Sequence, residues 1–437
     1  MKKNFILCVL MAAVAIFSYM AGDNLIFNEP NVRYVNNQNL TAKNLGIPCK
    51  DYYYESSDRL YARNIWDMKT FDNKVFMGFG DYQNNTGDTP IYYYKNDSLK
   101  KYDIKMFEDD NYEVSGLPTE QISRFFEIDN ELYTVSTDPT NWMVGEFYKL
   151  ENNRWKTYRK LDNCIHLYDM IKYDGKIFFG GAWYKLEDGY QKNIGIVQSI
   201  DADKLTDKKT KTNFVPFYKD NFLIEKGELY RCYDLFTYKN ELYAISYLNG
   251  DTIYDGLFKY NAKSNRFDYQ KSDEKNGITA VIQNRSKFNG FTLNYYKKGI
   301  ENVFSEPMLY AKFDLGDKFV AVCNDIFVST DLNTFKKANL GEKYKNFVVR
   351  DAVEFDNRYY FVASEKKGNT EYNNVLFETN DFKNFRTVGN FKTKAFVRSI
   401  EFLDNSLYIG CGSYSPSADD EKEQVNKYNG TLYRIDF

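Results

Sequence analysis

The chain has 437 residues, with 58 Lys and Arg against 61 Asp and Glu and a formal net charge of −3 at pH 7. A chain of this length exceeds one ordinary hydrophobic core, so it predicts several domains or one large fold built from repeats. The charges are interspersed and form no basic stripe, which argues against nucleic acid as a partner. Aromatic residues make up 18% of the chain and recur in short runs with β-branched residues, which favours a β-rich fold.

The first 22 residues have the pattern of an export signal. Lys2 and Lys3 precede an uncharged apolar run from Phe5 to Gly22. Because the cleavage site is ambiguous, an uncleaved anchor with the lysines kept inside remains an alternative. No later apolar stretch is long enough to span a bilayer, so membrane contact is expected only through residues 1–22. The sequence therefore predicts a secreted or cell-envelope protein whose residues 23–437 form a single domain.

A short hairpin recurs along the rest of the chain. Each copy has an apolar strand, a turn rich in Asp, Asn and Gly, and a second strand with an aromatic residue near its start. The copies begin at Ile65, Ser123, Leu167, Cys232, Met308, Val349 and Val397, and the copy at Met308 is the loosest. Their turns contain Asp72, Asp129, Asp174, Lys239, Asp314, Asp356 and Asp404. Irregular intervals of about 40 to 75 residues around a constant hairpin are typical of blades with variable loops.

A second hairpin follows most copies, which predicts four strands per unit. The last copy supplies only three strands before the chain stops at Phe437. We therefore expect a strand from residues 25–58 to complete that unit, because such closure removes an exposed sheet edge. Residues 270–307 fit no unit and predict an insertion between the fourth and fifth.

Two of the second hairpins carry a recognisable turn. STDLNTF, from Ser329, and TNDFKNF, from Thr379, resemble the S-x-D-x-G-x-x-W box of kelch-like and Asp-box (sialidase-like) propellers, although each is one residue shorter and has Phe in place of Trp. The resemblance implies an all-β fold, a seven-bladed β-propeller. In that superfamily the box is a folding element remote from the active site, so the resemblance leaves activity open.

Charged residues recur five positions before each turn. This repeat position holds Asp67, Arg124, Asp169, Asp234, Leu309, Asp351 and Ser399, and His166, Arg350 and Arg398 lie close by. In a propeller these side chains converge on the mouth of the central channel. One interpretation is structural, with each Asp tying its strand to the neighbouring one. The other is a polar ligand site formed by Asp67, Arg124, His166, Asp169, Asp234, Arg350, Asp351 and Arg398.

Three functions fit such a ring. The first is a monomeric binding module for a glycan or protein ligand, because Arg forms bidentate hydrogen bonds with carboxylates and Asp accepts hydrogen bonds from sugar hydroxyls. The second is a glycan-cleaving enzyme, either a glycoside hydrolase or a polysaccharide lyase, for which Arg124, His166 and Asp169 are the candidate catalytic residues. The third is a purely structural surface protein. We favour the binding module over the enzyme, and we expect no cofactor and no metal site.

Overall fold

The computed structural model describes residues 32–34, 38–53, 59–82, 84, 86–95, 98–101, 104–106, 112–114, 116–140, 145–162, 164–187, 190–207, 209–224, 229–248, 256–273, 276–278, 281, 308–414 and 426–437. The predicted export signal and most of the predicted insertion at 270–307 lie outside these residues. Among the described residues, no helix has the length and apolar character needed to cross a membrane.

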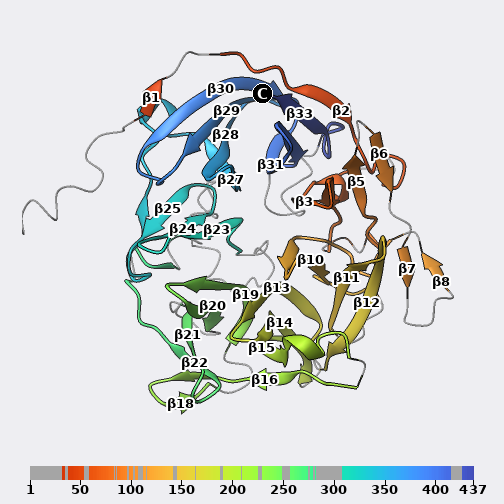
Figure 1. Ribbon diagram of the computed structural model, residues 1–437, viewed down its shortest axis with the longest axis vertical. Helices are drawn as coiled ribbons and strands as arrows, with labels where there is room; N and C mark the ends of the chain where they lie inside the picture. The colour runs from red at the N-terminus through yellow and green to blue at the C-terminus, as the bar shows by residue number, and fades with distance from the viewer. Residues whose placement is uncertain are drawn as a thin grey trace, which may run out of the picture.

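The described chain forms seven β-sheets arranged as a ring around a central axis (Figure 1). One strand of each sheet lines the centre of the ring. These inner strands are β3 (Asp67–Phe71), β9 (Phe125–Ile128), β13 (His166–Tyr173), β19 (Leu229–Tyr238), β23 (Ala311–Asp314), β27 (Val348–Phe355) and β31 (Phe396–Leu403). The protein is therefore a seven-bladed β-propeller, and this prediction is confirmed.

Each blade continues outward with three antiparallel strands. The second strands are β4 (Lys74–Gly78), β10 (Glu131–Val135), β14 (Lys176–Glu187), β20 (Glu241–Leu248), β24 (Phe319–Val322), β28 (Arg358–Gly368) and β32 (Ser406–Gly412). The third strands are β5 (Tyr92–Lys95), β11 (Gly145–Glu151), β15 (Tyr190–Asp201), β21 (Leu257–Asn261), β25 (Ile326–Ser329), β29 (Glu371–Thr379) and β33 (Leu432–Asp436). The outer strands are β6 (Ser98–Lys101), β12 (Arg154–Leu161), β16 (Asn213–Val215), β22 (Arg266–Tyr269), β26 (Lys336–Lys337), β30 (Phe385–Thr393) and β2 (Lys43–Gly46).

The first turn of most blades is a two-residue hairpin. In blade 1 the turn residues Asp72 and Asn73 have φ angles of 48° and 56°. Positive φ at both central positions matches the right-handed twist of the flanking strands, and Asp and Asn tolerate it better than most residues. Blade 5 is the exception, because its chain turns through residues 315–318, with Gly316 at φ 80°. This longer turn explains why the fifth copy of the repeat is the loosest.

The ring is closed by the N-terminal segment, as predicted. Strand β2 pairs antiparallel with β33, so the last blade combines the two ends of the chain. Strand β1 (Val32–Tyr34) pairs parallel with the outer strand β30 of blade 6. Both contacts cover edge strands that would otherwise be open to pairing with another chain.

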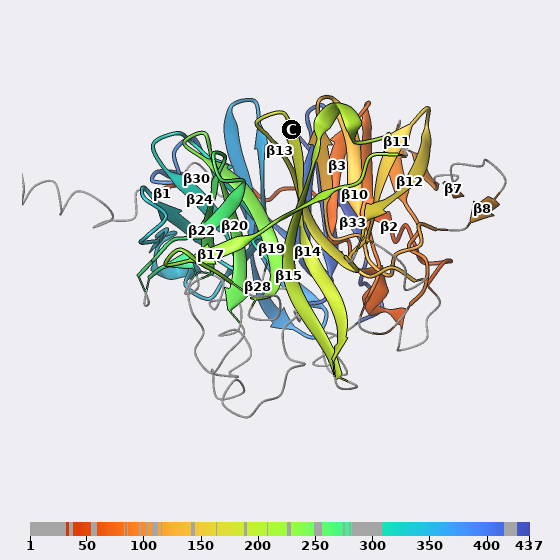
Figure 2. The same ribbon diagram turned by 90° about the horizontal axis from the view of Figure 1, so that it is seen from below.

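Two further hairpins extend the outer edges of blades 2 and 4. Strand β7 (Ile104–Met106), paired with β8 (Tyr112–Val114), lies parallel to β12. Strand β17 (Phe217–Lys219), paired with β18 (Phe222–Leu223), lies parallel to β22. The sequence did not indicate these pairings, because the strands are very short. In Figure 2 the hairpin that joins β14 and β15 projects beyond the ring on one side.

Apolar side chains fill the space between neighbouring blades. Phe236 of blade 4 packs on Phe319 of blade 5 with ring centroids 4.4 Å apart, and Phe355 of blade 6 stacks on Phe402 of blade 7 at 4.3 Å. Each such ring removes a large apolar area from water and stabilises the contact between blades. The cysteines of the described chain, Cys49, Cys164, Cys232, Cys323 and Cys411, are buried and unbridged, so they pack as small apolar residues.

The two turns that resemble an Asp box share one hydrogen-bond pattern. Asp331 Oδ1 accepts hydrogen bonds from the backbone N–H groups of Asn333 and Thr334, at 2.9 and 3.0 Å. Asp381 Oδ1 does the same for Lys383 and Asn384, at 2.9 and 2.8 Å. The carboxylate thereby holds its own turn in place, which is a folding role.

Candidate functional site

One residue of each blade contributes to a belt around the channel. The belt consists of Asp67, Arg124, Asp169, Asp234, Leu309, Asp351 and Ser399. Four of its carboxylates accept a hydrogen bond from a backbone N–H of the next blade. These pairs are Asp67 with Phe125 (2.7 Å), Asp169 with Leu235 (2.8 Å), Asp234 with Leu309 (2.9 Å) and Asp351 with Ile400 (2.9 Å). Ser399 Oγ donates to the carbonyl oxygen of Ile65 at 3.0 Å and links blade 7 to blade 1. The belt therefore ties successive inner strands together.

Half of the belt is a buried ion-pair network. Arg124 Nη1 lies 3.1 Å from Asp169 Oδ2, and Arg124 Nη2 lies 2.8 Å from Asp234 Oδ1. Lys312 Nζ contacts the same two carboxylates and lies 3.3 Å from Asp234 Oδ1. It also donates to the carbonyl oxygen of Leu235 at 2.7 Å. The side chains of Asp169 and Asp234 are 2% and 0% exposed, so two cations offset two buried carboxylates.

The pKa values in this network follow from the pairing. Burial acts to raise the pKa of Asp234, but the charges of Arg124 and Lys312 outweigh it and hold that pKa below its usual value. Burial likewise acts to lower the pKa of Arg124, and the charges of Asp234 and Asp169 outweigh it, so that the pKa of Arg124 is raised. Asp234 and Arg124 therefore both carry charge at neutral pH.

The other half of the belt has carboxyl groups with raised pKa values. Burial raises the pKa of Asp67 to about 6, although a hydrogen bond from Phe125 and the charge of Arg124 oppose it. Burial, and then the charge of Asp67, raise the pKa of Asp351 well above its usual value. Burial also raises the pKa of Glu401, further along the channel, to about 7. These groups bind protons more readily than free carboxylates do, so this side of the channel is less negative than its composition indicates.

A β-bulge immediately precedes the belt in four blades. The register with the second strand shifts between Leu167 and Asp169, between Cys232 and Asp234, between Val349 and Ala352, and between Val397 and Ser399. The residues directly before the belt at these bulges are Tyr168, Tyr233, Arg350 and Arg398. An extra residue leaves the strand ladder locally and re-aims its side chain. Trp66 holds the same repeat position in blade 1, and of these residues Trp66, Arg350 and Arg398 lie at the mouth of the channel, whereas Tyr168 and Tyr233 are buried.

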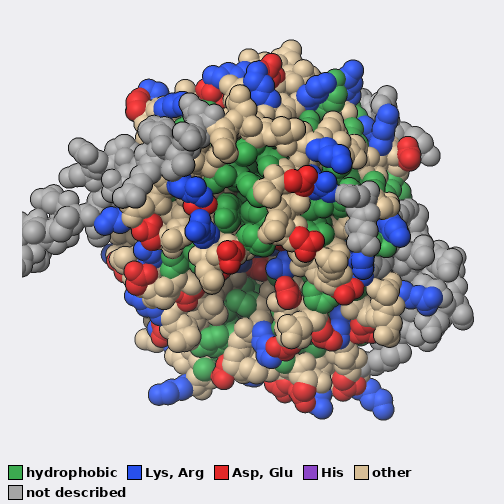
Figure 3. All heavy atoms as spheres, turned by 45° about the horizontal axis from the view of Figure 1, so that its top comes forward, with side chains coloured by type: hydrophobic (Ala, Val, Ile, Leu, Met, Phe, Trp, Pro, Cys, Tyr) green, Lys and Arg blue, Asp and Glu red, His purple; other side chains and the backbone are tan. Residues whose placement is uncertain are grey.

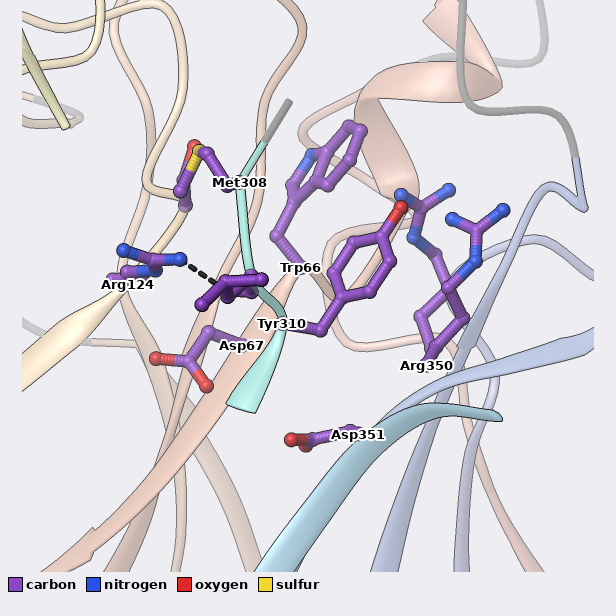
Figure 4. Close-up of a pocket in the computed structure, with 10 residues that line it drawn as sticks. Trp66, Asp67, Arg124, Met308, Tyr310, Arg350 and Asp351 are labelled. Atoms are coloured by element: carbon purple, nitrogen blue, oxygen red, sulfur yellow. Dashed lines mark hydrogen bonds between the residues drawn. The ribbon is translucent and has the colours of Figure 1, made fainter. Parts of the chain in front are cut away.

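A small pocket of about 40 Å³ lies at this mouth. Its lining residues are Trp66, Asp67, Ser123, Arg124, Met308, Leu309, Tyr310, Arg350, Asp351 and Arg398. In Figure 4 Arg124 and Arg350 flank Tyr310 from opposite sides, and Asp67 and Asp351 lie below the Tyr310 ring. The pocket thus combines residues from five blades.

Two arginines of the pocket are held against aromatic rings. Arg398 Cζ lies 3.9 Å from the centroid of the Trp66 ring, and Arg350 Cζ lies 4.9 Å from that of Tyr310. Their Nη atoms donate to backbone carbonyls, Arg398 to Ser413 at 2.9 Å and Arg350 to Tyr414 at 3.2 Å. Stacking and carbonyl contacts fix both planes, so the guanidinium groups are preorganised at the mouth.

A wider cavity of about 420 Å³ extends from the belt along the inner strands. It shares Asp67, Arg124 and Asp351 with the mouth pocket, and Asp169 and Lys312 also line it. Apolar residues such as Phe126 and Phe313 form much of its remaining wall. Seen from one side, the ring is hollowed near its centre, and charged side chains of both signs gather around the hollow (Figure 3).

The predicted site residues divide into three groups. Asp67, Arg124, Arg350, Asp351 and Arg398 meet at the mouth pocket. Asp169 lines the wider cavity, whereas Asp234 lines neither cavity and is ion-paired with Arg124, which lines both. His166 lines neither of these cavities.

His166 is held in the wall between blades 2 and 3. Its Nδ1 lies 2.8 Å from the carbonyl oxygen of Thr137, so Nδ1 carries the proton and donates. Burial, together with the charge of Arg231, lowers the pKa of His166 to about 3. The neutral ring stacks on Tyr168 at a centroid distance of 6.1 Å. This geometry is that of a hydrogen-bonded structural histidine.

Sequence reasoning missed three residues of the site, namely Trp66, Tyr310 and Lys312. Trp66 was detectable, because reading the repeat one residue before the belt gives Trp66, Tyr168, Tyr233, Arg350 and Arg398 in five copies. Tyr310 and Lys312 belong to the loosest copy, whose register was the least certain. No group of three or more metal-binding side chains occurs within the part of the chain that the structure describes.

Comparisons with known proteins show no family for this chain. No family model matches the chain, and no curated protein matches it. Among solved structures, the extracellular domain of a hybrid two component system from B. thetaiotaomicron aligns with a TM-score of 0.49 and 9% identity over 91% of this chain. That alignment covers 42% of the other chain, so this chain spans less than half its length.

Two further similar structures come from Pyrococcus species. The β-propeller domain of the Trilobed protease from Pyrococcus furiosus aligns with a TM-score of 0.39 and 8% identity, over 85% of this chain and 92% of that one. The acylaminoacyl peptidase of Pyrococcus horikoshii aligns with a TM-score of 0.45 and 10% identity, over 86% of this chain and 55% of that one. At this similarity neither structure carries an argument about this chain. Membership of the kelch-like or Asp-box superfamily stays a prediction.

Proposed function

We propose that the protein is an exported propeller binding module that holds a glycan or protein ligand at the mouth pocket through an acidic group of the ligand. The observation that carries this proposal is the pair Arg350 and Arg398, which project from bulges at the mouth and are fixed against Tyr310 and Trp66. A planar guanidinium presents two parallel donors that match a carboxylate or sulfate. Preorganised donors also lose little side-chain entropy when a ligand binds.

The size and charge of the pocket support an acidic group. A volume of about 40 Å³ accommodates a few water-sized groups, which suits a carboxylate and excludes a whole sugar ring. The raised pKa values of Asp67 and Asp351 reduce the repulsion that an incoming anion would meet. The remainder of the ligand would then lie on the aromatic rim at Trp66 and Tyr310, where an apolar sugar face or a peptide side chain can pack.

We favour binding over glycan cleavage because the candidate catalytic residues are engaged in contacts within the protein. Arg124 and Asp169 are ion-paired with each other. His166 lines neither the mouth pocket nor the wider cavity, and its Nδ1 donates to the carbonyl oxygen of Thr137. A catalytic acid or base must reach the substrate. Export through residues 1–22 would place the module outside the cytoplasm, where glycans and surface proteins occur.

Calorimetric titration with matched ligands tests the proposal. The panel comprises uronic acid and sialic acid oligosaccharides, their neutral counterparts, and acidic and neutral peptides. We expect an acidic member to bind the full chain. Replacing Arg350→Gln or Arg398→Gln should weaken that binding about ten- to a hundredfold, because each change removes a charge-assisted hydrogen bond.

The matched control is Arg154→Gln, since Arg154 is exposed on the outer strand β12, away from the mouth. It should bind as the unmodified protein does. If no acidic ligand binds, or if both mouth variants keep full affinity while remaining folded, the proposed function is wrong.

A further inference from the structure

A second groove lies on the outer part of blade 6, away from the channel. It has a volume of about 680 Å³, within the range of ordinary ligand sites. Its lining residues are Asn39, Lys343, Tyr344, Phe347, Glu365, Lys367, Asn373, Asn374, Val375, Asn390, Phe391 and Lys392. None of them lines the mouth pocket or the wider cavity. Strands β28, β29 and β30, the N-terminal segment at Asn39, the short helix η6 (Glu342–Tyr344) and Phe347 just after it supply these residues.

The register of strands β29 and β30 places amide side chains on one face of this groove. Asn373 lies opposite Lys392, and Val375 lies opposite Asn390. Residues directly opposite on antiparallel strands share a face, and so do residues two positions apart, so Asn373 and Asn390 point to the same side. Asn39 joins them through its bridge to Asn390.

These amides are available for a ligand. No hydrogen bond joins the side chain of Asn39, Asn373 or Asn390 to another residue that the structure describes. Asn39 is exposed, and the other two are half-buried. Each amide offers two N–H donors and a carbonyl acceptor, the combination that matches a hydroxyl group acting as acceptor and donor.

The floor and the opposite wall of the groove are rigid. Asn374 is 1% exposed, accepts a hydrogen bond from Ser364 Oγ at 2.7 Å and donates to Thr393 Oγ1 at 3.0 Å. Tyr344 packs edge-on against Phe347 and against Phe377, with centroids 5.3 and 5.1 Å apart. Tyr344 is 4% exposed, so its contact fixes the half-buried Phe347, which can pack against an apolar sugar face.

The charges of the groove are largely compensated. Lys367 pairs with Glu365 at 2.6 Å, and Lys392 pairs with Glu371 at 2.6 Å. The third lysine that lines the groove, Lys343, has its Nζ 5.3 Å from the centroid of the Tyr344 ring. The groove therefore lacks the concentrated charge that distinguishes the mouth pocket, and a neutral ligand suits it better than an anion.

Backbone pairing with an extended peptide is blocked at this edge. Asn390 N donates to the carbonyl oxygen of Gln38 at 3.0 Å, and Leu40 N donates to that of Asn390 at 2.8 Å. Peptides that bind to sheet edges need such groups to be open. Recognition here must therefore come from side chains, which favours a hydroxyl-rich ligand over a peptide strand.

We propose that the groove between η6 and strands β29 and β30 is a second ligand site, which binds a neutral carbohydrate chain. Asn373 and Asn390 hydrogen-bond the sugar hydroxyls, and Phe347, held in place by the buried Tyr344, packs against the apolar face of a sugar ring. The site is independent of the mouth pocket, so the two can engage different parts of one glycan or different ligands.

The test uses neutral hexasaccharides built from glucose, mannose, xylose or galactose units, titrated into the full chain and followed by calorimetry. We expect at least one to bind. The double variant Asn373→Ala, Asn390→Ala should weaken that binding about tenfold or more, because two hydrogen-bonding groups are lost. Phe347→Ala should weaken it as well, and Arg350→Gln should leave it unchanged.

The matched control is Asn213→Ala, since Asn213 is an exposed amide on the outer strand β16 of blade 3. Melting temperatures establish that every variant is folded. The proposal is overturned if no neutral hexasaccharide binds at millimolar concentration. It is also overturned if the double variant binds the saccharide as tightly as the control does.

Discussion

Replacing Arg124→Met should destabilise the ring strongly. The guanidinium of Arg124 lies 3.1 Å from Asp169 Oδ2 and 2.8 Å from Asp234 Oδ1, and these carboxylates are 2% and 0% exposed. Methionine fills a similar volume but leaves Lys312 as the remaining cation for two buried carboxylates. Removing one partner of a buried ion pair costs about 3–5 kcal/mol, because the remaining charge has lost its compensation. The free energy of unfolding, measured by urea titration at pH 7, should fall by an amount in that range.

The pH dependence separates this explanation from a simple packing defect. In the folded protein Arg124 and Lys312 hold the pKa of Asp234 below its usual value, against the effect of burial. This contribution to stability is present above the pKa of an unfolded Asp, about 4, and is lost as the pH falls through the folded pKa. The difference between the protein and the variant should therefore be largest at neutral pH and shrink toward pH 3.

Arg154→Met is the matched control, because Arg154 is exposed on β12. It should change the free energy of unfolding by no more than about 0.5 kcal/mol, as is usual for surface substitutions. A loss below about 1 kcal/mol in Arg124→Met, the range of exposed ion pairs, would refute the reasoning. So would a large loss that does not depend on pH.

Three further predictions concern the channel, a turn and the closure of the ring. Because burial raises the pKa of Glu401 to about 7, the ionised Glu401 side chain lowers the stability of the folded protein at pH 8. Glu401→Gln should therefore be about 1–3 kcal/mol more stable than the unmodified protein at pH 8, and this advantage should shrink toward pH 5. Urea titration at both pH values measures the difference. Asp381→Ala removes the acceptor of two backbone N–H groups and should lower the free energy of unfolding by about 1–2 kcal/mol. Asp381→Asn keeps an acceptor oxygen and should lower it less. Equal losses of the two variants in calorimetric melting would contradict the role of the Asp381 carboxylate in holding the turn. Deleting residues 1–46 exposes the edge of β33, so light scattering should detect association that the full chain lacks, and a stable monomer would contradict the closing role of β2.

The architecture could be predicted because it depends on local chemistry. The turn at Asp72 and Asn73 needs two positive φ angles, and the residues that tolerate them leave a visible signature in most copies. The missing fourth strand of the last blade followed from simple counting, and β2 supplies it. Pairings such as β7 with β12 could not be predicted, because strands of three residues carry no usable periodicity and their partners are distant in sequence.

The candidate site was predicted in part, and the limits have physical causes. The repeat position of Asp67 and Asp351 was identified because the belt links adjacent blades at equivalent points. Arg350 and Arg398 were also named from their place beside the belt, but the β-bulges that set their orientation leave no mark in the sequence. Lys312 joins the ion-pair network from the loosest copy of the repeat, where the register could not be assigned with the same accuracy.

His166 shows what a single sequence does not determine. Its uniqueness and its place beside the belt made it a candidate for catalysis. The structure gives its Nδ1 proton a carbonyl acceptor, Thr137, and burial keeps the ring neutral. Whether a histidine faces a cavity or a backbone carbonyl depends on tertiary packing, which sequence position alone does not reveal.

The most direct test of the proposed function is the crystal structure of the full chain in complex with the tightest acidic ligand of the panel. The account predicts that the acidic group of the ligand lies within hydrogen-bonding distance of the guanidinium groups of Arg350 and Arg398, with the rest of the ligand on the rim at Trp66 and Tyr310. A ligand bound elsewhere, with the mouth pocket holding only water, would contradict it.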